Sequence, residues 1–316
     1  MKRLLISWRQ LGISVEAVMI EDMNPILCNR LWEKLPMKGI QDHALISGEY
    51  LYGYIPMPEL PSICHYNAKK KEPRDKQEVG RINLSTLQHF SIKYGSVNEY
   101  LEATPVAQII ESDIEKIKEV GRRTWESTFR NKQLIEFTIS KLPEGKLIRN
   151  KKEHNKINNI NARKLINEID IECRRIWLKP PREIYYLFNG KSKCPTGSFG
   201  YYLNTIVFAD GLMRSLGIMT FSDVLRMLDN KTLRCSYIKK IIQDSISNVV
   251  IDFLEYCGFK KLKKYYQKYC RIVPFIEDKS DLRAMILSMI NYVNRLSGWI
   301  LHYFPWALGE KMRRDL

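Results

Sequence analysis

The spacing of apolar residues changes its period once along this chain, close to residue 145. Before that point, apolar and polar residues tend to alternate at every second position, as they do in β-strands. After it, apolar residues recur about every 3.6 positions, as they do in α-helices. Net charge changes at the same place: residues 1–145 carry 20 Lys/Arg and 19 Asp/Glu (+1), and residues 146–316 carry 31 and 16 (+15). We therefore predict two domains of different class, which makes the chain α+β, at 1–145 and 163–316, with a polar linker at 146–162.

Short strands bounded by Gly and Pro dominate the first domain. The strand-like segments lie at 4–8, 13–20, 43–47, 49–55, 79–84, 88–94, 105–110 and 134–140. Two helices are expected, at 26–35 and 112–130, and the prolines at 56, 58 and 61 predict a loop, because proline cannot donate to a strand ladder. A charged run at 69–76 predicts a solvated loop. Many short strands with two helices indicate a small closed β-barrel.

The second domain is predicted to be an all-α helical bundle. Helical spacing and capping residues place helices at 166–177, 198–216, from a cap at Thr220 or Ser222 to 228, 236–257 and 280–303. The stretch 260–269 interleaves lysines with aromatic residues, which is typical either of a nucleic-acid surface or of a basic helix with its aromatic side chains in the bundle.

Several classes of protein are disfavoured by what the sequence lacks. No apolar run approaches the 18 or so residues of a membrane span. The seven cysteines show no CxxC spacing and the five histidines no H-x-x-x-H pair, so neither a disulfide framework nor a metal site is expected. The chain has no G-x-G-x-x-G or P-loop sequence, which argues against nucleotide and dinucleotide binding. Free thiols fit a cytoplasmic protein.

Segments 43–49 and 89–95 alternate so that one face of each expected strand is apolar and the other polar. The apolar sets, Ala44 with Ile46 and Phe90 with Ile92, are expected to be buried. The opposite faces then display His43, Ser47, His89, Ser91 and Lys93. Two interpretations are open: an acid/base surface, or two half-exposed strands with ordinary polar outer faces.

Four motifs carry a resemblance to known proteins: NPILCNRLWEKLP at 24–36, HALISGE at 43–49, IKYG at 92–95 and VGRRTW at 120–125. These segments resemble the cyclophilin-like barrels of bacterial small-molecule proteins. Such a barrel followed by a basic helical bundle, at this total length, resembles the cucumopine/mikimopine synthase family. The chain lacks the F-H-R segment and the Q-G-G-D turn of true cyclophilins, which argues against prolyl isomerase activity and leaves the barrel unaffected.

The resemblance implies a cofactor-independent Pictet–Spengler condensation of L-histidine with 2-oxoglutarate, giving cucumopine or mikimopine. The amine attacks the keto carbon, water leaves, and an imidazole carbon closes on the iminium before losing its proton. No hydride donor is needed, in agreement with the missing dinucleotide motif.

Roles for side chains follow from this chemistry as hypotheses. Lys93 is the base or a proton-transfer partner, and His89 or His43 moves a proton. Glu49 holds the substrate ammonium or imidazole. Ser47 and Ser91 orient the substrate carboxylates, and Arg122 and Arg123 anchor a carboxylate. The pocket wall is assigned to Tyr52, Tyr54 and Tyr94. For the two arginines a surface salt bridge is the open alternative, and the substrate's own imidazole is an alternative base.

The sequence leaves two other functions open. One is a non-catalytic barrel whose basic helical domain binds nucleic acid or an acidic partner. The other is a prolyl isomerase-like enzyme. For the synthase we expect small-molecule substrates, a homo-oligomer formed through the helical half, and no membrane or nucleic-acid partner.

Overall fold

The computed structural model describes residues 1–142, 157–189, 191, 201–245 and 248–307. The chain divides into two compact units, Met1–Lys152 with Pro305–Leu316, and Glu153–Phe304. The predicted linker lies largely outside the described residues, and the first helix of the second unit already begins at Ile160.

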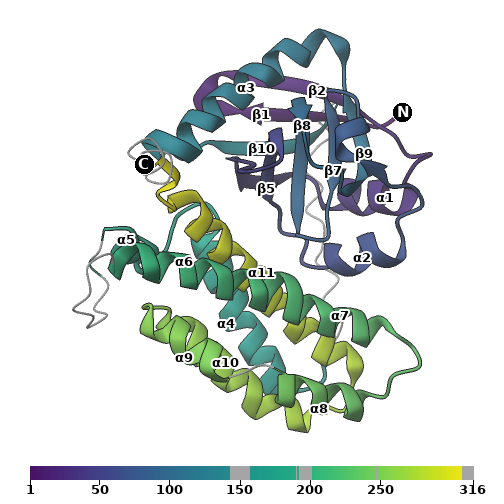
Figure 1. The fold of residues 1–316 in the computed structure, drawn as a ribbon. Coiled ribbons are helices and arrows are strands. Elements are labelled where there is room, and N and C mark those ends of the chain that lie inside the picture. The colour runs from purple at the N-terminus through teal and green to yellow at the C-terminus, as the bar shows by residue number, and fades with distance from the viewer. Residues whose placement is uncertain (143–156, 190, 192–200, 246–247, 308–316) are drawn as a thin grey trace. The chain divides into compact units, whose positions relative to one another are not determined.

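Antiparallel strands and three α-helices make up the described part of residues 1–142 in the first unit (Figure 1). The strands are β1 (Arg3–Trp8), β2 (Ile13–Met19), β3 (Met37–Ile40), β4 (Asp42–His43), β5 (Gly48–Tyr54), β6 (Glu72–Pro73), β7 (Arg81–Leu84), β8 (His89–Val97), β9 (Glu102–Ile109) and β10 (Glu136–Leu142). The helices are α1 (Pro25–Lys34), α2 (Leu60–Tyr66) and α3 (Ile114–Glu126). The expected strands at 4–8, 13–20, 79–84, 88–94, 105–110 and 134–140 are therefore confirmed, as is the helix at 26–35.

The sheet closes nearly into a barrel, as the sequence predicts. Its order is β3-β10-β1-β2-β9-β7-β8-β5-β4, and β6 pairs with β9 beside this path. Its two end strands, β3 and β4, follow one another along the chain and are separated only by Gln41. Near this seam a Cβ on Gly39 would lie 2.7 Å from the carbonyl oxygen of Tyr54, and one on Gly53 would lie 2.7 Å from that of Ile40. Glycine at both positions lets β3 and β5 approach.

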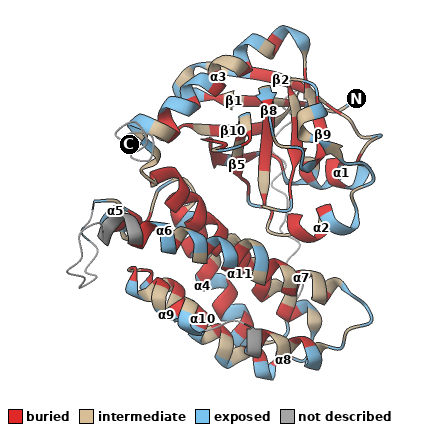
Figure 2. Cartoon of the chain, in the orientation of Figure 1, coloured by how far each residue is buried: buried red, intermediate tan, exposed pale blue. Residues whose placement is uncertain are grey.

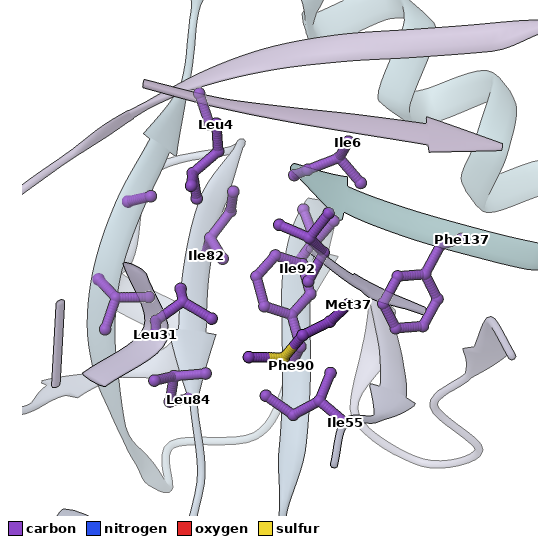
Figure 3. Packing of buried hydrophobic residues seen from close by; sticks show 14 of the residues in the cluster. Leu4, Ile6, Leu31, Met37, Ile55, Ile82, Leu84, Phe90, Ile92 and Phe137 are labelled. Carbon is purple, nitrogen blue, oxygen red and sulfur yellow. The ribbon is translucent and has the colours of Figure 1, made fainter. Parts of the chain in front are cut away.

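Apolar side chains from opposite walls fill the barrel (Figure 3). Leu4 and Ile6 of β1 share this core with Ile82 of β7 and with Phe90 and Ile92 of β8, and all five are at most 2% exposed. At about 25 cal/mol per Å² of apolar surface buried, burial of this core is the main contribution to the stability of the unit.

The expected strand at 43–47 is wrong beyond its first residue. Only His43 belongs to β4, and residues 44–47 form the turn that leads into β5. Ile46, predicted to be buried, is 88% exposed, whereas Ala44 is buried. Gly48 explains the difference, because its φ of +98° is a left-handed conformation that interrupts an extended strand.

Two segments predicted as loops are more ordered than expected. Helix α2 occupies part of the proline-rich segment, and Pro61 fits its first turn, where a missing N–H costs no hydrogen bond. Within the charged run, Glu72–Pro73 forms β6 and Arg74–Lys76 forms a short 3₁₀ turn. Strand β8 also runs beyond the expected end at residue 94, through Gly95 to Val97.

The described part of the second unit consists of helices and the turns that join them, with no strand. Its helices are α4 (Ile160–Ile176), α5 (Arg182–Phe188), α6 (Tyr201–Arg214), α7 (Ser222–Asp229), α8 (Cys235–Ser245), α9 (Asn248–Tyr256), α10 (Lys260–Ile272) and α11 (Lys279–Tyr303). Residues of α11 from Met285 onward are mostly buried, so this is the central helix of the bundle (Figure 2). The helix expected at 236–257 corresponds to α8 and α9, and residues 246–247 between them lie outside the described residues. None of the described helices has the length and apolar character of a membrane span.

Candidate functional site

The structure brings five of the predicted site residues onto one face of β5 and β8. Tyr52 pairs with Ser91 and Tyr54 with His89, while Tyr50 pairs with Lys93. Because cross-strand partners point to the same side of a sheet, these residues form one surface, which we call the β5–β8 polar face. Its members are Tyr50, Tyr52, Tyr54, His89, Ser91 and Lys93.

Aromatic contacts hold His89 at one end of this face. Its ring lies 4.6 Å from the ring of Tyr52 and 4.5 Å from that of Tyr54, centroid to centroid. His89 precedes Lys93 by four residues, which is about 13 Å along an extended strand. His89 and Lys93 therefore occupy separate parts of the polar face.

Lys93 ties a loop to the polar face. Its Nζ donates to the carbonyl oxygens of Arg74 at 3.0 Å, Asp75 at 3.0 Å and Gln77 at 2.6 Å. Burial lowers the pKa of Lys93, and the nearby charge of Asp75 opposes this. The three bonds use all three protons of the ammonium, so the geometry favours a fixed cation over the base that the sequence predicts. We call residues 72–77 the strap.

A buried hydrogen-bond network lies beneath the strap. The Tyr50 hydroxyl lies 3.0 Å from Ser91 Oγ and accepts from Asn83 Nδ2 at 3.0 Å. Asn83 and Gln77 in turn exchange two amide hydrogen bonds, at 2.9 and 3.0 Å. Ser91 is thus part of the network that fixes Tyr50. Burial raises the pKa of Tyr50, so its hydroxyl stays protonated.

An ion pair of Arg74 and Glu99 lies next to this network. The Arg74 guanidinium bonds the Glu99 carboxylate and lies 5.3 Å from the centroid of the Tyr50 ring. Ser47 Oγ donates to the same carboxylate oxygen at 2.7 Å. The side chains of Arg74 and Glu99 are 14% and 20% exposed, so both are largely desolvated and still reachable from solvent. A cation, a carboxylate and a hydroxyl therefore converge at one point.

His43 and Tyr94 lie on the other side of the sheet. His43 pairs with Leu51, which pairs with Ile92, so His43 shares the apolar face of β8. Tyr94 belongs to the same core. His43 Nε2 and the Tyr94 hydroxyl are 2.7 Å apart. Sequence alternation predicted one shared surface for His43 and Lys93; the strand pairing separates them.

Glu49 lies where β5 and β8 lose their regular pairing. Its carboxylate accepts from the Ser96 backbone N–H at 2.6 Å, and a Cβ on Gly95 would collide with it. Its negative charge raises the pKa of Tyr94, which burial has already raised, to about 12. Glu49 thus binds the backbone at this irregularity, and its predicted contact with substrate stays a hypothesis.

Arg122 and Arg123 lie on α3, and both pair with Glu119 of the same helix. Their side chains are 71% and 60% exposed. The arrangement matches the surface salt bridge that the sequence left open as an alternative.

Gly121 of the same helix gives a testable packing prediction. A Cβ there would lie 2.4 Å from the Tyr94 ring, so we expect Gly121→Ala to lower the free energy of unfolding by about 1–3 kcal/mol. The matched control is Gly211→Ala in α6, where nothing lies within 4 Å of the new Cβ. There alanine is expected to be neutral or stabilising. Urea unfolding of both variants measures the difference, and equal effects would contradict the packing of Tyr94 on α3.

The residues of this site that the sequence did not indicate are Arg74, Glu99, Tyr50, Asn83 and Gln77. Arg74 stands in a charge run, where solvated side chains are the ordinary expectation, and Glu99 follows the end of a strand. One usable signal is the spacing of Tyr50, Tyr52 and Tyr54, because alternation along a strand puts Tyr50 on the same face as the predicted residues Tyr52 and Tyr54.

Comparison with known proteins shows what the chain is related to. The profile of the cucumopine synthase C-terminal helical bundle domain matches residues 162–303. A solved structure, "Structure of McbB in complex with tryptophan", is similar over 98% of this chain and 99% of that chain, with 33% sequence identity and a TM-score of 0.91. The chain belongs to the cucumopine synthase family. Membership confirms the predicted fold and places the chain among the Pictet–Spengler-type synthases. No curated protein sequence matched.

The described residues include no group of three or more His, Cys, Asp or Glu side chains that could hold a metal ion.

Proposed function

We propose that this synthase condenses L-histidine with 2-oxoglutarate by a Pictet–Spengler cyclisation that needs no cofactor. The observation that carries the proposal is the match to the cucumopine synthase bundle within a chain similar to McbB over its whole length. The tryptophan bound to McbB adds support. Tryptophan and histidine both place a nucleophilic aromatic carbon three bonds from the α-carbon that bears the amine, which is the arrangement this cyclisation requires.

Arg74 is our candidate for binding a substrate carboxylate. In the structure its guanidinium bonds the carboxylate of Glu99, the same chemical group that the amino acid and the oxo acid present. Guanidinium–carboxylate pairs are among the stronger hydrogen-bonded contacts in proteins. A substrate carboxylate that binds the Arg74 guanidinium weakens the ion pair between Arg74 and Glu99. Glu99 then becomes a better proton acceptor.

Glu99 is our candidate for the proton acceptor in the last step. After the imidazole carbon bonds to the iminium carbon, that ring carbon carries a hydrogen whose loss restores aromaticity. A carboxylate held by Ser47 at 2.7 Å has a fixed direction for this transfer. The protonated carboxyl returns its proton to water after the product leaves.

The rest of the polar face orients these groups. Tyr50 provides the surface on which the Arg74 guanidinium lies, and Lys93 holds the strap that carries Arg74. We assign His89, between Tyr52 and Tyr54, to contacts with the distal part of a substrate. His89 keeps its predicted role in proton transfer as a secondary hypothesis.

The test is product formation from the purified protein without any nicotinamide. L-histidine or L-tryptophan is incubated with 2-oxoglutarate or pyruvate, and products are identified by mass spectrometry. The proposal predicts a product from L-histidine and 2-oxoglutarate with the summed mass less one water. A product formed only when NADH is added would contradict it, and a product only from L-tryptophan would correct the substrate.

Loss of the Arg74 guanidinium gives a second prediction. We expect Arg74→Gln to raise the KM of one carboxylate substrate about 10- to 100-fold, because a charged hydrogen bond is worth roughly 1.5–3 kcal/mol. The matched control is Arg122→Gln, a loss of the same charge from an exposed position on α3. Steady-state kinetics with each substrate varied in turn identifies the affected substrate. Equal KM values for wild type and Arg74→Gln would remove Arg74 from the site.

The basic stretch of α10 lends no support to the nucleic-acid alternative. Three of its lysines pair with carboxylates of the bundle: Lys261 with Glu172, Lys268 with Glu168, and Lys263 with both Asp252 and Glu255. The tyrosines between them are buried, as a helix that packs in a bundle requires.

A further inference from the structure

The turn between β4 and β5 supports the Ser47–Glu99 contact. The Asn98 N–H donates to the Ser47 carbonyl at 3.0 Å, and the Ser96 N–H donates to the Glu49 carboxylate at 2.6 Å. Residues 44–49, which we call the 44–49 turn, are thereby joined to the end of β8 from which Glu99 follows. The position of this turn therefore sets the position of Ser47 Oγ.

At its base the 44–49 turn is fixed by His43. The His43 N–H donates to Thr128 Oγ1 at 3.2 Å, and Nδ1 lies 2.7 Å from the Ala44 carbonyl oxygen. A carbonyl can only accept, so Nδ1 carries the proton and, in the neutral ring, Nε2 accepts from the Tyr94 hydroxyl. His43 thus joins Tyr94 to the first carbonyl of the turn.

Tyr94 is itself held against α3. Its ring packs on the backbone at Gly121, and Trp125 of the same helix lies edge-on to His43 with ring centroids 4.8 Å apart. Tyr94 is 5% exposed and His43 2%. A continuous set of contacts therefore runs from α3 through Tyr94 and His43 to the turn that carries Ser47.

We propose that the His43–Tyr94 hydrogen bond positions the catalytic carboxylate from the opposite side of the sheet. By fixing the Ala44 carbonyl it holds the 44–49 turn in the conformation that brings Ser47 Oγ to Glu99. His43 and Tyr94 are positioning residues in this account, because they lie on the apolar face of β8 and not on the polar face. The inference rests on the proposed function for the role of Glu99.

A double-mutant cycle separates positioning from general stability. Tyr94→Phe removes only the hydroxyl, and Ser47→Ala removes the group through which Tyr94 is proposed to act. We expect each single change to lower kcat about tenfold, and Tyr94→Phe to change kcat less than about twofold when Ser47 is already alanine. Fold-changes that multiply in the double variant would overturn the proposal.

Thr124→Val is the matched control for loosening of α3. Its buried hydroxyl donates to the Val120 carbonyl at 2.8 Å, a bond within α3 that is not among the contacts joining Tyr94 to the 44–49 turn. We expect this variant to lower the melting temperature as Tyr94→Phe does, with kcat unchanged. If Thr124→Val lowers kcat as much as Tyr94→Phe, the effect of Tyr94 is one of stability and the proposal fails.

A readout that needs no activity keeps this inference distinct from the proposed function. Amide hydrogen exchange, measured by NMR, is expected to become several-fold faster at Ser96 and Asn98 in Tyr94→Phe, and to stay unchanged in Thr124→Val. Unchanged exchange at both amides in Tyr94→Phe would overturn the inference. Absence of any product from the wild-type protein would instead overturn the proposed function, and the exchange data would still decide whether Tyr94 holds the turn.

Discussion

Glu99→Gln is expected to lower kcat by about 10²- to 10⁴-fold, the usual contribution of a positioned acid or base. The amide has the size of the carboxylate, and its oxygen still accepts from Ser47 and Arg74. It cannot take up the ring proton at neutral pH. Loss of the charge also weakens the ion pair with Arg74, so we expect the melting temperature to fall by about a few degrees while the protein stays folded. Single-turnover kinetics with L-histidine and 2-oxoglutarate measures the loss.

Glu102→Gln is the matched control for this substitution. Glu102 is an exposed residue of β9, three positions further along the chain, and its loss removes the same charge. We expect it to retain the wild-type rate. If Glu99→Gln retained more than about a tenth of the wild-type rate, the base would be another group, and the imidazole of the substrate would be the first candidate.

Lys93→Met is expected to lower the free energy of unfolding by about 2–4 kcal/mol. The substitution preserves an unbranched side chain of similar length and leaves the carbonyl oxygens of Arg74, Asp75 and Gln77 without their donor. Each unsatisfied buried polar group costs roughly 1–3 kcal/mol, and water admitted beneath the strap recovers part of this. Urea unfolding measures the difference, and limited proteolysis should cleave the strap faster.

Lys76→Met provides the comparison, because its side chain is 79% exposed. We expect it to change stability by less than about 0.5 kcal/mol, as surface substitutions usually do. The pair also tests the role that the sequence suggested for Lys93. A Lys93→Met variant with wild-type stability and no activity would restore Lys93 as the base.

Much of the fold was predictable because its signals are local. Period-two alternation identified β1, β2, β8 and β10, and helical spacing with its caps identified α1 and α11. The failures have local physical causes. Gly48 adopts a left-handed conformation that interrupts the expected strand, and Pro61 occupies the first turn of α2, the one part of a helix that accepts proline.

The site was only partly predictable because some of its residues lie in regular strands and others lie in the segments between strands. Alternation within one strand correctly placed Lys93, Ser91 and His89 on a common face. Alternation cannot say which face of one strand meets which face of another, since that depends on register, and His43 was therefore assigned to the wrong face. Arg74 and Glu99 lie outside regular strands, where only the folded backbone brings them together.

The most direct measurement uses L-histidine deuterated at the imidazole carbon that forms the new bond. Incubation with 2-oxoglutarate and the protein, without a nicotinamide, is predicted to give a product that has lost one water and the deuterium, and Glu99→Gln is predicted to abolish its formation. A product that keeps the deuterium and requires a hydride donor would contradict the account.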